Sequence, residues 1–149
     1  MYAYVDRPVE SLSNNGRFLL WAMRGWTHAA TVGRCPPQAI RCGFAGVGAL
    51  GALPDFHVAM ALLASDAVDT IELAPLACGR IAEGEAILLG LWHDLASWQE
   101  ACARATLAML ASADSVTPIA RAMEAAIVRL TLAGFNLSSL SPQMKHQDN

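Results

Sequence analysis

The chain has 149 residues, the size of a single domain, and its 54% hydrophobic content can fill a core without disulfides or metal. Its net charge of −3 argues against nucleic-acid binding, and its longest apolar run, residues 42–53, is too short for a transmembrane span. Only 15% of the residues are charged, which predicts that part of the surface is buried in a homodimer.

The cysteines and the N-terminal region predict where the protein resides. The four cysteines lie singly, with no CxxC spacing, and the first residues contain no apolar segment typical of a signal peptide. Disulfides are rare in reducing compartments. We therefore expect a cytoplasmic protein with reduced thiols.

The periodicity of apolar residues and the capping signals predict helices along most of the chain. Residues 1–13 are expected to form an extended N-terminal arm, and residues 138–149 a flexible C-terminal tail. Between them lies one helical domain, residues 14–137. The segments predicted to be helical are 17–31, 37–51, 55–66, 82–96, 97–111, and a sixth from Ser115 or Thr117 to just before Gly134. The predicted fold is all-α, an irregular bundle of five to six short helices.

Two segments depart from the simple helical pattern. Pro36-Pro37 fits the start of the second helix, but four glycines in residues 43–51 indicate either close helix contact or a broken segment. Residues 70–73 form the only strand-like run, and we expect them to be an extended connector.

The sixth predicted helix has two apolar sides. The expected core stripe consists of Ile119, Met123, Ala126, Ile127 and Leu130. Val128 and Leu132 lie on the opposite side, which predicts burial there too, either inside the bundle or across a subunit contact. For Leu132 the core is favoured, because the residue neighbours Phe135 in the sequence.

A basic stripe around a tryptophan is the sharpest feature of the first helix. At 100° per residue, Arg17, Trp21, Arg24 and His28 fall on one side, opposite an apolar face that suffices for the core. Guanidinium groups around an indole can bind an anion or a partner. The alternative is that Trp21 packs on a neighbouring helix while the arginines extend into solvent. Both interpretations stay open, as does a subunit contact.

The turn at residues 75–85 is densest in reactive side chains. A Cys78 thiolate near Arg80 and a helix N-terminus would be stabilised, which predicts either a reactive thiol or, with His57 or His93, a zinc site. No pair of these residues has the spacing of metal ligands, and a structural cysteine is the alternative. Glu83 and Glu85 are interpreted as first-turn residues that favour the helix dipole.

Two short motifs are similar to a family of small, uncharacterised helical proteins of alphaproteobacteria. They are RFLLWAMR at residues 17–24 and APLACGRIAEGEA at residues 74–86. The resemblance implies a helical fold and a bacterial host, but no activity. In that family, extra cysteines often precede the turn cysteine. Here Leu76 and Ala77 occupy those places, which weakens the zinc interpretation.

The sequence carries no nucleotide-binding, hydrolase or metalloprotease motif: GxGxxG after a strand, GxSxG and HExxH are all absent. We therefore expect a non-enzymatic, homodimeric interaction or regulatory module without a cofactor. The alternative is a small metal-binding or thiol-dependent protein centred on Cys78.

Overall fold

The computed structural model describes residues 4–140 and confirms the all-α prediction. Its α-helices are α1 (Asn14–Thr31), α2 (Pro36–Gly46), α3 (Leu53–Asp66), α4 (Glu83–Ala96), α5 (Glu100–Leu110) and α6 (Val116–Leu132). Short 3-10 turns lie at Val9–Ser11, Leu50–Ala52 and Ala113–Ser115. Within residues 4–140 there is no β-strand, only two isolated bridges, and no helix has the length and hydropathy to cross a membrane.

Local chemistry explains where the first helices begin and end. α1 begins at Asn14, earlier than predicted, because the Ser13 side chain accepts a hydrogen bond from the Gly16 N–H at 3.3 Å. α2 ends at Gly46 rather than at residue 51, because Gly48 adopts a φ of 74° that leaves the helical region. The glycine-rich segment is thus a broken helix, which is one of the two alternatives that the sequence indicated.

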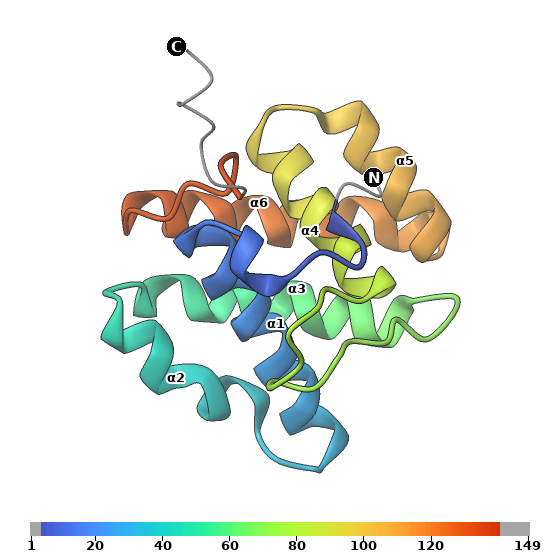
Figure 1. Cartoon of the computed structure of the whole chain (residues 1–149). Helices are drawn as coiled ribbons and strands as arrows, with labels where there is room; N and C mark the ends of the chain where they lie inside the picture. The colour runs from blue at the N-terminus through green and yellow to red at the C-terminus, as the bar shows by residue number, and fades with distance from the viewer. Residues whose placement is uncertain (1–3, 141–149) are drawn as a thin grey trace.

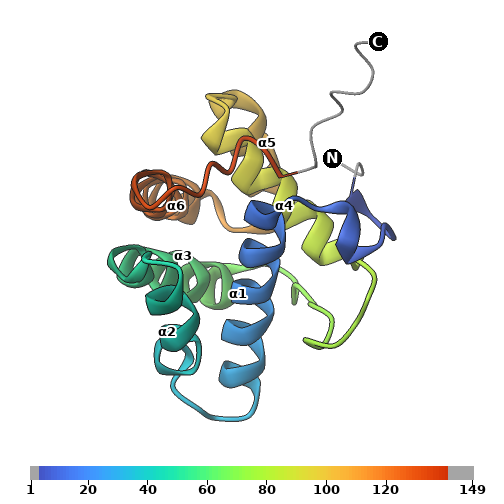
Figure 2. The ribbon, with the colours of Figure 1, turned by 60° about the vertical axis from the view of Figure 1, so that its left-hand side comes forward.

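The helices pack around α3 and α6, which form the most extensive helix pair. Figure 2 shows these two helices nearly end-on, one above the other, with α1 crossing beside them and α2 alongside α1. Phe56 of α3 stacks on Trp92 of α4 with ring centroids 5.7 Å apart, and both side chains are fully buried. α4 also packs against α6, α5 and α1. Figure 1 shows the arrangement of the six helices, with α4 in yellow-green.

The contact between α1 and α2 depends on two glycines. A Cβ on Gly25 would lie 2.8 Å from Ile40, and a Cβ on Gly43 would overlap the Trp21 ring. The close helix contact that the glycines suggested is therefore present at Gly43.

The predicted arm and tail are packed where the structure describes them, so these boundaries need correction. Leu12 is fully buried, and the backbone of residues 6–9 pairs with residues 79–81. Leu137 and Leu140 are each 1% exposed, and the Leu140 carbonyl accepts from the Ser13 N–H at 2.7 Å. Residues 138–140 therefore belong to the helical body. The rest of the predicted tail, 141–149, lies outside the described residues.

Candidate functional site

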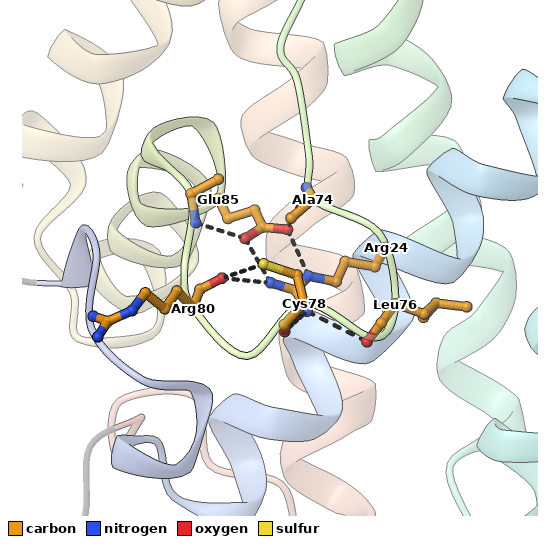
Figure 3. Close-up of polar contacts among 7 residues, drawn as sticks. Arg24, Ala74, Leu76, Cys78, Arg80 and Glu85 are labelled. Atoms are coloured by element: carbon orange, nitrogen blue, oxygen red, sulfur yellow. Dashed lines mark hydrogen bonds and ion pairs between the residues drawn. The ribbon is translucent and has the colours of Figure 1, made fainter.

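Arg24 of α1 forms hydrogen bonds to the longest connection between two helices, residues 67–82, and holds it against the core (Figure 3). Its guanidinium forms a bidentate pair with Glu85, in which Nε donates to Oε2 at 2.6 Å and Nη2 donates to Oε1 at 2.9 Å. The same group donates to loop carbonyls: Cys78 at 2.8 Å, Arg80 at 2.9 Å and Leu76 at 3.5 Å. Arg24 thus organises the loop.

The Glu85 carboxylate likewise accepts several hydrogen bonds. Besides Arg24, its carboxylate accepts from the Ala74 N–H and the Ala82 N–H, both at 2.8 Å. Glu85 is fully buried and Arg24 is 3% exposed. All five guanidinium N–H groups and the four main acceptor positions of the carboxylate are used. This Arg24 centre (Arg24, Glu85 and the backbone groups that they bind) has no capacity left for a substrate, so its role is structural.

The basic stripe predicted on α1 is therefore not an exposed binding surface as a whole. Arg24 is buried, because its long side chain reaches the loop and Glu85 rather than solvent. Trp21 is 36% exposed, as expected, but its ring packs against Gly43 of α2, which matches the packing alternative. Arg17 and His28 are exposed, and Arg17 donates to the Leu12 carbonyl at 3.1 Å. No anion pocket results.

The predicted zinc residues are also not brought together. His57 accepts a hydrogen bond from the Trp26 indole at 2.9 Å, and His93 lies beside Asp94 and Ser97. Cys78 is exposed, and its Sγ donates to the Arg80 carbonyl at 3.4 Å. Across residues 4–140, no group of three Cys, His, Asp or Glu side chains could hold a metal ion. The geometry therefore gives no support to a metal centre at Cys78.

A different residue, Trp98, is the least buried aromatic side chain that the structure describes, at 93% exposed. It follows Ser97, the C-cap of α4, where the Gln99 N–H donates to the Asp94 carbonyl at 2.8 Å and the Trp98 N–H to the Leu95 carbonyl at 3.5 Å. These two bonds define a Schellman motif, whose residue after the cap needs a left-handed backbone. Trp98 accordingly has a φ of 63°.

Three other helices end in the same motif, and all three use glycine at this position. Gly33 after α1, Gly48 after α2 and Gly134 after α6 have φ values of 79°, 74° and 99°. Glycine adopts this conformation without strain, whereas a bulky side chain costs about 1–2 kcal/mol. Trp98 is thus held in an unfavourable backbone conformation while its side chain points into solvent.

Trp98 is one of the residues that line a largely apolar groove of about 820 Å³ between the end of α4, the start of α5 and α6. Leu132 and Val128 of α6 contribute to it and are 80% and 57% exposed. The core placement favoured for Leu132 is therefore wrong, although the predicted core stripe of α6 is buried. We call Trp98 together with this groove the Trp98 surface, and it is the candidate functional site.

Sequence reasoning missed Trp98, although a signal was present. The predicted fourth and fifth helices adjoin at residues 96–97, and two helices can abut only through a sharp turn. Such turns usually need a glycine or asparagine with positive φ, and residues 95–100 contain neither. The absence of glycine at a required turn could have singled out Trp98.

No protein-family model, curated protein or solved structure matches the chain. The similarity to a helical family of alphaproteobacteria therefore stays a prediction.

Proposed function

We propose that the protein is a non-enzymatic interaction module that forms a homodimer through the Trp98 surface. The observation that carries the proposal is an indole that is 93% exposed, on a backbone with positive φ, in the lining of an open groove. Backbone strain of this kind is enriched at functional sites, where the surrounding structure maintains it. Burial in a partner would supply the stabilisation that the monomer lacks.

A second copy is the occupant that this geometry favours. The protruding side chain and the groove lie on the same face, so in a two-fold arrangement each Trp98 enters the groove of the other copy. Val128 and Leu132 supply apolar contacts, and the Glu124 carboxylate at the groove supplies an acceptor for the indole N–H. The low charged fraction of the chain, 15%, also favours a buried surface of this kind.

The same proposal places the protein in the cytoplasm. Cys35, Cys42, Cys78 and Cys102 are all unpaired and exposed. Exposed thiols persist in reducing compartments, which supports this placement.

Sedimentation equilibrium of the wild-type chain and of Trp98→Ala tests the proposal. We expect the wild type to have twice the mass of the 15.8 kDa chain at micromolar concentration. Trp98→Ala should weaken association by about 2 kcal/mol or more, as central interface tryptophans do.

Trp21→Ala is the matched control, because it removes a second tryptophan on another helix. Trp21 packs on α2, so this change should lower the free energy of unfolding and leave the dimer affinity unaltered. A wild-type chain that sediments at 15.8 kDa would refute the homodimer. A dimer that survives Trp98→Ala would place the subunit contact on a different surface.

A further inference from the structure

A second groove lies at the opposite end of the α4–α5 hairpin from the Trp98 surface. It has a volume of about 400 Å³ and is formed by residues 68–72, the start of α4 and the end of α5. Figure 2 shows α4 running from the loop that contains residues 68–72 toward α5. Gly84 and Leu95, which belong to the two grooves, are separated by ~16 Å along the helix at 1.5 Å per residue.

Apolar side chains form one component of this groove. Val68 and Met109 are 61% and 66% exposed, and Ile71, Ile87 and Leu110 line the groove with them. Exposed apolar side chains that line a hollow are typical of a binding surface. Methionine adapts its shape to different apolar partners, so Met109 suits a contact of this kind.

Carboxylates form the other component. The ionisable residues that line the groove are Asp69, Glu72 and Glu83, and no basic side chain lines it. Within residues 4–140, none of these three takes part in an ion pair. They do not cluster closely enough to hold a metal ion either. We call this surface, with its apolar and acidic components, the acidic groove.

A second hollow extends the same surface. It has a volume of about 390 Å³, shares residues 68–71 with the acidic groove, and reaches α1 and α3 on the other side of this segment. Its only ionisable lining residue is Asp69, and apolar side chains such as Met60 and Leu63 contribute most of the remainder. On both sides of residues 68–71, the ionisable side chains that line the hollows beside the apolar ones are therefore all acidic.

We propose that the acidic groove binds a basic amphipathic segment of a partner protein, in which lysine or arginine alternates with large apolar residues. The apolar side chains of the segment contact Val68, Met109 and their neighbours, and its cations pair with the carboxylates. Charge complementarity selects this occupant, because anionic membranes and nucleic acids are repelled by the same three carboxylates. A second copy placed symmetrically on this face would bring like charges together. The inference goes beyond the homodimer and involves none of the residues of the Trp98 surface.

The test uses a synthetic amphipathic peptide of lysine and leucine and the full-length chain in isothermal titration calorimetry. The peptide should bind with one site per chain, while a lysine–serine peptide and a glutamate–leucine peptide should bind far more weakly. Glu72→Gln/Glu83→Gln should lower the affinity by about three- to tenfold, since each exposed ion pair contributes a modest increment. Met109→Ser should also weaken binding.

The matched control is Glu10→Gln/Asp114→Asn, which removes two exposed carboxylates from other parts of the chain and changes the net charge equally. This variant should keep the wild-type affinity. Hydrogen exchange should show that the peptide protects residues 68–72. Equal binding by both double variants would overturn the proposal, as would tight binding of the lysine–serine peptide. Recruitment of the chain to anionic vesicles, or protection of residues 68–72 by self-association alone, would assign the groove to another occupant and overturn it too.

Discussion

The Arg24 centre and Trp98 both depart from the usual placement of charged and apolar side chains, in opposite directions. Arg24 and Glu85 are charged and buried, whereas Trp98 is large, aromatic and 93% exposed. At the Arg24 centre the cost of burying two charges is offset, because every donor and acceptor has a partner within the chain. At Trp98 the backbone has a positive φ that is held by two hydrogen bonds of the helix end, while the side chain itself is almost fully exposed. The Arg24 centre is satisfied within the monomer, whereas the role of Trp98 in the homodimer that we propose requires a second chain.

Removing Arg24 should have the largest effect. Arg24→Ala leaves the Glu85 carboxylate buried without its cation, so we expect a loss of about 3–5 kcal/mol in the free energy of unfolding. Urea denaturation followed by circular dichroism measures this loss. Arg121 is exposed on α6, and Arg121→Ala should change the same quantity by less than about 0.5 kcal/mol. Similar stabilities for the two variants would show that the Arg24 centre does not hold the fold.

Replacing both charges should be less harmful but still costly. Many buried ion pairs can be replaced by apolar residues without loss. Here Arg24→Met/Glu85→Leu would also remove the Glu85 partner of two N–H groups and the Arg24 donor of three carbonyls in residues 74–82, of which the Arg80 carbonyl would keep only the weak Cys78 thiol donor. We expect a net loss of about 2 kcal/mol, since unsatisfied backbone groups are expensive even when part of the loop opens to water.

Limited proteolysis separates this loss from a general weakening of the core. The double variant should be cut first within residues 67–82, while the wild type resists cleavage there. A double variant as stable as the wild type would show that the loop does not depend on these hydrogen bonds.

The smallest predicted effect is a gain. Trp98→Gly removes the strain of positive φ and should raise the free energy of unfolding of the monomer by about 0.5–1 kcal/mol. The measurement must be made below the dissociation constant of the dimer, because association adds apparent stability. The same variant should lose dimer affinity, so the two effects have opposite signs.

Gly134→Ala is the reciprocal change at the end of α6. Gly134 has a φ of 99° and no atom within 4 Å of an added Cβ, so the cost of alanine arises from the backbone alone. We expect a loss of about 1 kcal/mol. If Trp98→Gly were destabilising instead, the aromatic side chain would contribute to the monomer fold and its assignment to a partner contact would be wrong.

The helices were predictable because their signals are local. Apolar spacing placed the core stripe of α6 correctly, and Pro36 marked the start of α2. The boundaries shifted by a few residues where a side chain or a turn decided them, as at Ser13 and Gly48. Glu85 was correctly placed in the first turn of α4, where it accepts from the Ala82 N–H, but its partner on α1 could not be foreseen.

The candidate site was less predictable, because exposure depends on contacts between distant segments. Arg24 looked exposed by its helical angle, and Leu132 looked buried by its neighbour Phe135; the structure reverses both. By itself, the sequence determined an all-helical chain with a low charged fraction, since periodicity and composition are properties of local segments. Only the tertiary structure decided that Arg24 is inside and Trp98 outside. The reason is that Arg24 and Glu85 are 61 residues apart in the sequence, and α4 packs against α6 through contacts between distant segments. A local sequence pattern contains no information about either contact.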